Sequence, residues 1–77
     1  MSLHPITEAR DASGLTLKEL ASRAGISVPT LERIEDGRTK RPHDRVLDAL
    51  AAALETEPGT LELQMTHHRR DLERGRA

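Results

Sequence analysis

Residues 14–42 read GLTLKELASRAGISVPTLERIEDGRTKRP, and they contain the start and stop signals of two short helices. Thr16 and Glu19 have the spacing of a capping box, in which each side chain bonds the backbone N–H of the other residue. Gly25 is typical of the left-handed turn that ends a helix. Ser27 is a second N-cap, and Pro29 falls in the first turn after it, where a missing N–H costs little. The stretch therefore predicts one helix over residues 16–23 and another over residues 28–36.

The flanking sequence predicts further helices on both sides of this stretch. Pro5 is suited to the first turn of a helix, which we expect over residues 5–13. Another helix follows Pro42. Its apolar residues recur at helical spacing and are expected to face inward, and they are Val46, Leu47, Leu50, Ala51 and Leu54.

The end of the chain changes character after its last apolar cluster. Pro58 and Gly59 are typical of a turn, and we expect a short fifth helix that contains Leu61 to begin there. The residues beyond position 65 are mainly polar and charged, which is typical of disorder. We therefore expect an all-α, five-helix domain over residues 1–65, followed by a basic and mostly disordered tail over residues 66–77.

Length and composition narrow the class of protein. The chain has 77 residues, which is enough for one small domain, and it contains no Cys, Phe, Trp or Tyr. Disulfides and thiolate metal sites are thereby excluded, and the core must be built from aliphatic side chains. The sequence contains no apolar run that could span a membrane and no signal pattern, so we expect a cytoplasmic protein. A chain this small is not expected to be an enzyme.

The charge is unevenly distributed along the chain. The net charge is only −1, but residues 38–45 carry a net charge of +3 and residues 69–77 carry +2, whereas residues 46–68 carry −4. A local positive field attracts an anionic partner more effectively than the total charge implies. A solvated loop and a frayed end are the alternative explanation for these two basic segments.

Two short helices joined through a glycine-containing turn are the elements of a helix-turn-helix motif. Periodicity alone fits any helical hairpin, but the small Ala21, at the expected crossing of the two helices, favours the motif. The stretch resembles the Cro/repressor (Xre-like) helix-turn-helix family, which includes the lambdoid phage repressors. The matching motifs are Gly14-Leu15-Thr16, Leu20-Ala21, Gly25-Ile26-Ser27 and Ile34-Glu35-Asp36-Gly37, within a resemblance that spans residues 6–63.

This resemblance implies a lambda-repressor-like DNA-binding domain, in which the helix over residues 28–36 enters the major groove of double-stranded DNA. The residues that stand where the family contacts bases and nearby phosphates are Ser27, Val28, Pro29, Thr30 and Arg33. Thr16 and Leu17 stand where the family touches the DNA backbone. The segment Arg38, Thr39, Lys40 and Arg41 matches a loop that grips phosphates. Arg10 and Glu35 occupy the positions of a partly buried salt bridge.

The chemistry of these side chains supports the implied roles unevenly. Arg38, Lys40 and Arg41 are suited to phosphate contacts, which give affinity and register but no sequence choice. Arg33 is the one residue of the outward face that is a usual guanine reader. Glu32 is either an acceptor for a cytosine amine or a partner for charges on the helix surface, and we favour the second role.

Two departures from the family pattern affect DNA reading. Leu17 replaces a usual glutamine, so it either packs inward or lies against a sugar. Pro29 replaces a residue that is often polar, so it contributes shape alone. These changes favour recognition through DNA shape, or else a domain kept for contacts with proteins.

No residue pattern indicates a metal, a cofactor or a catalytic group. The adjacent His67 and His68 lack the spacing and the additional ligands that zinc requires. No serine, acid and histidine arrangement suggests a nucleophile. We therefore expect a binding protein without a cofactor.

A single recognition helix covers few base pairs, so modules of this type pair on two half-sites. We expect a homodimer whose interface includes Leu61, Leu63 and Met65, because alternation at these positions would expose an apolar edge. The alternative is that Leu61 closes the core of the monomer. The leading functional hypothesis is a transcriptional repressor. The others are a DNA-binding antitoxin whose partner is a toxin, and a protein-interaction module that does not bind DNA.

Overall fold

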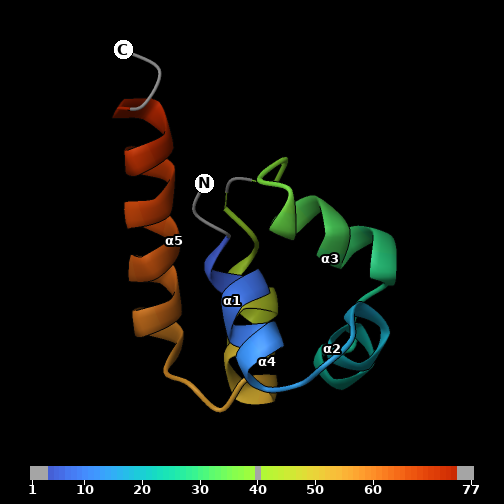
Figure 1. Ribbon diagram of the computed structural model, residues 1–77. Coiled ribbons are helices and arrows are strands. Elements are labelled where there is room, and N and C mark those ends of the chain that lie inside the picture. The colour runs from blue at the N-terminus through green and yellow to red at the C-terminus, as the bar shows by residue number, and fades with distance from the viewer. Residues whose placement is uncertain (1–3, 40, 75–77) are drawn as a thin grey trace.

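The computed structural model describes residues 4–39 and 41–74, and these residues form five helices and no strand (Figure 1). The helices are α1 (Pro5–Ala12), α2 (Leu17–Ala24), α3 (Val28–Glu35), α4 (Asp44–Ala53) and α5 (Pro58–Arg74). The predicted all-α class is confirmed, and α1, α2 and α3 begin and end within one residue of their predicted bounds. No helix in the described part of the chain is long and apolar enough to cross a membrane.

Local capping sets the start of α2 as the sequence predicted. The Glu19 N–H donates to Thr16 Oγ1 over 3.1 Å, and the Thr16 N–H donates to Glu19 Oε1 over 3.0 Å. The hydrogen bond from the Thr16 backbone to the ionised carboxylate is the main cause of a lowered pKa of Glu19. The capping box therefore forms, and it satisfies two N–H groups that would otherwise lack a partner.

Aliphatic side chains from all five helices meet in one core. The fully enclosed ones are Ile6, Leu20, Leu31, Ile34, Leu50 and Leu61. Helix α4 packs against α2 and α5, while α1 packs against α3 and α5. In Figure 1, α5 and α3 consequently lie at opposite sides of the molecule, with α1 and α4 between them. This arrangement leaves one face of α3 directed away from the other helices.

The structure corrects the expectation for the end of the chain. Residues 66–74 belong to α5, a single 17-residue helix, where the sequence predicted a short helix followed by disorder. One side of this helix carries Leu61, Met65, His68 and Leu72 at helical spacing, and Leu61 and Met65 anchor that side to the core. Because packing of one face stabilises the whole helix, charged residues on the other face do not end it. Residues 75–77 lie outside the described part of the chain.

The same helix changes the expected dimer contacts. Leu61 and Met65 are buried in the monomer core, so these two do not form an exposed edge. The alternation expected for positions 61, 63 and 65 would require an extended chain, whereas a helix turns Leu63 about 200° away from Leu61. Leu63 accordingly remains 58% exposed, and Leu72 is 51% exposed. Only Leu63 among the three predicted dimer residues lies on the surface.

Candidate nucleic-acid interface

A tight turn connects α2 to α3. Gly25 has φ 70°, a conformation that a side chain with a Cβ adopts at a cost of about 1–2 kcal/mol. The next N–H, of Ile26, donates to the Ala21 carbonyl over 3.0 Å and closes the end of α2. Ser27 then caps α3 by accepting the Thr30 N–H over 3.2 Å. The turn is therefore fixed by hydrogen bonds within the stretch that predicted it.

Helix α3 has one buried face and one open face. Leu31 and Ile34 are enclosed in the core, whereas Pro29, Glu32 and Arg33 are exposed. Neither Glu32 nor Arg33 forms an ion pair with any residue that the structure describes. The guanidinium of Arg33 therefore keeps its donors available for a ligand.

Three of the predicted contact residues have hydroxyl groups that already form hydrogen bonds within the domain. Thr16 caps α2, and Ser27 caps α3. The hydroxyls of Ser27 and Thr30 also bond to each other over 2.7 Å. Each hydroxyl retains some hydrogen-bonding capacity, but its position is set by the cap.

The two predicted apolar contacts are only partly available. Leu17 and Val28 are half-buried and pack against the hydrophobic core. Leu17 thus adopts the first of the two roles considered for it, which is inward packing. Val28 retains a partly exposed surface at the start of α3, where an apolar contact with a base is feasible.

The loop after α3 is anchored to the end of that helix. Gly37 has φ 80° and turns the chain, and the N–H groups of Arg38 and Thr39 both donate to the Arg33 carbonyl, over 2.9 and 3.1 Å. Thr39 is half-buried, whereas Arg38 and Arg41 are exposed. The loop thus places Arg38 at the C-terminal end of α3 and Arg41 against α5. Lys40, the third predicted cation of this segment, lies outside the described residues.

Both described arginines of the loop have carboxylate partners, which the sequence did not reveal. Arg38 Nη2 lies 2.9 Å from Asp36 Oδ2, and Arg41 Nη2 lies 3.3 Å from Glu62 Oε1 on α5. All four side chains are well exposed, so each pair contributes at most about 1 kcal/mol. Asp36 is close enough in sequence to have been suspected as a partner, whereas Glu62 is brought to Arg41 only by the tertiary fold.

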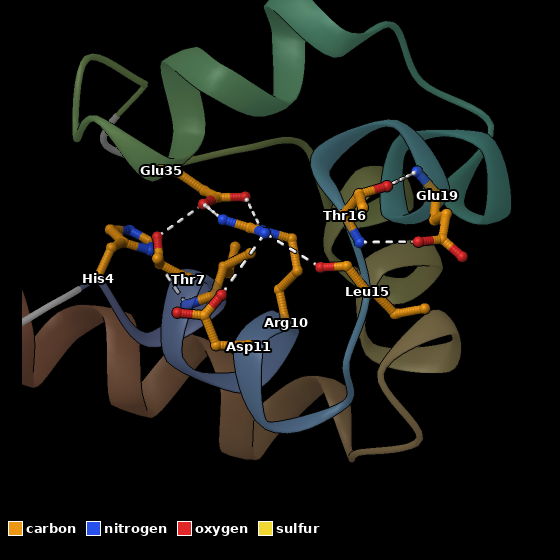
Figure 2. A network of polar contacts seen from close by, with 9 residues as sticks. His4, Thr7, Arg10, Asp11, Leu15, Thr16, Glu19 and Glu35 are labelled. Carbon is orange, nitrogen blue, oxygen red and sulfur yellow. Dashed lines mark hydrogen bonds and ion pairs between the residues drawn. The ribbon is translucent and has the colours of Figure 1, made fainter.

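A polar network behind α3 fixes its orientation (Figure 2). Arg10 on α1 donates through Nε to Glu35 Oε2 over 3.1 Å and through Nη2 to Glu35 Oε1 over 3.2 Å. Its Nη1 donates to the Leu15 carbonyl over 3.1 Å, and the Thr7 hydroxyl donates to Glu35 Oε1 over 2.7 Å. The structure thus contains the salt bridge that the resemblance implied, and Thr7 is a partner that sequence reasoning missed.

This pair is shielded from water. The side chains of Arg10 and Glu35 are only 15% and 9% exposed. The hydrogen bond to Glu35 is the main cause of a raised pKa of Arg10, so the guanidinium stays charged. Because the two residues come from α1 and α3, the pair ties α3 to the body of the domain.

His4 begins α1 and is held in its neutral form. Its Nδ1 accepts the Ile6 N–H over 3.2 Å, and its ring meets that of His68 edge-on, with centroids 5.3 Å apart. Burial and, secondarily, the nearby His68 lower the pKa of His4 from 6.5 to about 4, against an opposing effect of Glu35. The two rings do not indicate a metal site, since Nδ1 of His4 is occupied as an acceptor. No group of three potential metal ligands occurs among the described residues.

The lowered pKa of His4 predicts a loss of stability in mild acid. Protonation is easier in the unfolded chain, which therefore binds the extra proton first as the pH falls from 6.5 toward 4. We expect the free energy of unfolding to fall by about 1–2 kcal/mol between about pH 7 and pH 4.5. This loss is smaller than a fully buried histidine would cause, because the ring of His4 is partly exposed. Urea denaturation at several pH values measures this loss. The variant His4→Asn keeps a capping acceptor but does not titrate, so a loss as large as in the unsubstituted protein would contradict this assignment.

Comparison with known proteins agrees with this geometry. A family model described as a helix-turn-helix domain matches residues 6–64, which is well over half of the chain. The matched range includes the whole of α2, the turn and α3, and it extends into α5. No curated protein and no solved structure matches the chain. On the residues matched, the chain belongs to the helix-turn-helix domain family.

Proposed function

We propose that the protein is a sequence-specific regulator of transcription that binds double-stranded DNA with α3 in the major groove. The observation that carries this proposal is the open face of α3, with Arg33 unpaired among the described residues and two exposed arginines in the adjoining loop. A helix is of the right width to enter the major groove, and a guanidinium there bonds guanine through two donors. Family membership and the chain's resemblance to the phage repressors support the same function.

The loop supplies affinity in this mechanism, and α3 supplies sequence choice. Arg38 and Arg41 bind phosphates after leaving Asp36 and Glu62, which costs little because exposed ion pairs are weak. Arg33 then reads a guanine edge, and Val28 contacts an apolar part of a neighbouring base. Pro29 offers shape alone, so DNA shape contributes to the choice of site.

We further propose that the protein acts as a repressor by occupying its operator as a homodimer in the cytoplasm. Two copies on half-sites about 34–36 Å apart double the number of contacts. The side of α5 that carries Leu63 is the candidate interface, since Leu63 is the predicted dimer residue that is exposed there.

Salt dependence of DNA binding tests the proposed function. We expect affinity for a mixed-sequence duplex to fall steeply with salt, and Arg38→Ala/Arg41→Ala to reduce the slope of log K against log salt by about two for each protomer bound. The matched control Arg70→Ala/Arg74→Ala removes the same charge from α5 and is expected to leave the slope nearly unchanged. A fluorescence anisotropy titration at several salt concentrations measures both slopes. An affinity that does not depend on salt would contradict DNA binding.

A further inference from the structure

Helix α5 brings an additional arginine to the loop that follows α3. Arg69 is exposed, and it lines a small hollow of about 80 Å³ between this loop and α5, together with Arg41, Pro42 and Glu62. The same side chain lines a second hollow that borders Asp36, Gly37 and Thr39. Arg69 therefore lies against the phosphate-contact loop, although it is 28 residues away from Arg41 in the sequence.

Helical spacing explains why Arg69 reaches this position. Glu62 and Arg69 are seven residues apart, which is nearly two full turns, so they lie on the same side of α5. Glu62 already holds Arg41 from the loop at 3.3 Å. Met65, between them on the helix, is buried and fixes that side of α5 against the domain. The Arg41–Glu62 pair thus holds the loop against the side of α5 that carries Arg69.

The charges around the hollow favour an anion. Its charged side chains are Arg41, Glu62 and Arg69, so two guanidiniums face one carboxylate. Arg69 forms no ion pair with any residue among those that the structure describes. This hollow therefore has one positive charge in excess, and the carboxylates of Asp36 and Glu73 line the second hollow on the other side of Arg69. A phosphate placed in the first hollow would accept hydrogen bonds from both guanidiniums and relieve their mutual repulsion.

We propose that Arg69 and Arg41 together bind a phosphate of the DNA backbone, so that α5 is part of the DNA interface. This inference rests on the proposed function and adds to it a contact from a part of the chain that the sequence assigned to a disordered tail. Arg69 gives affinity and fixes the register of α3, and it does not read bases.

Single substitutions on α5 test the proposal. With a mixed-sequence duplex, we expect Arg69→Ala to weaken binding about threefold to tenfold near physiological salt and to reduce the salt slope by about one, each for every protomer bound. The control Arg70→Ala removes the same charge from the next residue, which lines neither hollow, and it is expected to change neither quantity. Both side chains are exposed, so folding should persist, and circular dichroism and thermal melting verify this.

The outcomes separate this proposal from the general function. Equal losses of affinity in Arg69→Ala and Arg70→Ala would show a diffuse effect of charge and would overturn the specific contact. A loss of affinity in neither variant would overturn it as well. A salt-dependent wild type whose slope responds to Arg38→Ala/Arg41→Ala but not to Arg69→Ala would overturn this proposal alone. Titration with inorganic phosphate, followed by the NMR signal of the Arg69 side chain, gives a further test. Saturable binding of the free ion by a protein whose duplex affinity is unaffected by Arg69→Ala would assign the hollow to a small anion instead.

Discussion

Replacing Glu35 with alanine is expected to lower the free energy of unfolding by about 2–4 kcal/mol. The substitution leaves the guanidinium of Arg10 in a site that is only 15% exposed, without the carboxylate that accepts two of its hydrogen bonds. Removing one partner of a buried pair costs about 3–5 kcal/mol, and partial exposure reduces that cost here. The Thr7 hydroxyl also loses its acceptor. Urea denaturation at neutral pH measures the change.

Two further variants isolate the contribution of this pair. Glu32→Ala removes the same side chain one turn earlier on the exposed face of α3, and we expect a change within about 0.5 kcal/mol. The double substitution Arg10→Met/Glu35→Leu removes both charges together, so it should be more stable than Glu35→Ala alone. If Glu35→Ala were no more destabilising than Glu32→Ala, the pair would have no structural role.

Replacing Arg33 with alanine is expected to weaken binding to the preferred operator about 5- to 150-fold, equivalent to the loss of about 1–3 kcal/mol. The exposed guanidinium forms no ion pair with a described residue, so its contribution is available to DNA. Without Arg33, guanine should no longer be preferred at the base position that this side chain contacts. The phosphate contacts from the loop should remain. Selection of bound sequences from a randomised duplex pool identifies the operator, and titration of single-base variants then locates the affected position.

The dependence of the lost affinity on DNA sequence distinguishes a base contact from a phosphate contact. Arg33→Lys keeps the charge but lacks the planar two-donor fork, so we expect it to retain affinity for mixed-sequence DNA and to lose much of the base preference. Glu32→Ala removes the neighbouring carboxylate and should leave the preference at the Arg33 position intact. Uniform weakening by Arg33→Ala across all sequences would assign Arg33 to the phosphate backbone instead.

Local patterns predicted the helix-turn-helix because the interactions that define it are local. The capping box joins Thr16 to Glu19, and the second cap joins Ser27 to Thr30. The turn closes between Ala21 and Ile26. Partners three to five residues apart are visible in a sequence, and so are the inward positions of a helix that has a regular apolar stripe. The ion pair of Arg10 and Glu35 was expected only through family resemblance, since it joins two helices.

The sequence by itself determined three things: the class of the fold, the bounds of α1 to α3, and the outward position of Glu32 and Arg33 on α3. Only the tertiary structure decided that α5 continues to Arg74, that Leu61 and Met65 are core residues, and that Arg41 and Arg69 flank Glu62. The polar segment after Met65 has little helix signal of its own. Its helix is stabilised by packing against α1 and α4, whose residues are distant in the chain. Contacts between such distant segments depend on how all the helices pack together, and no local pattern records them.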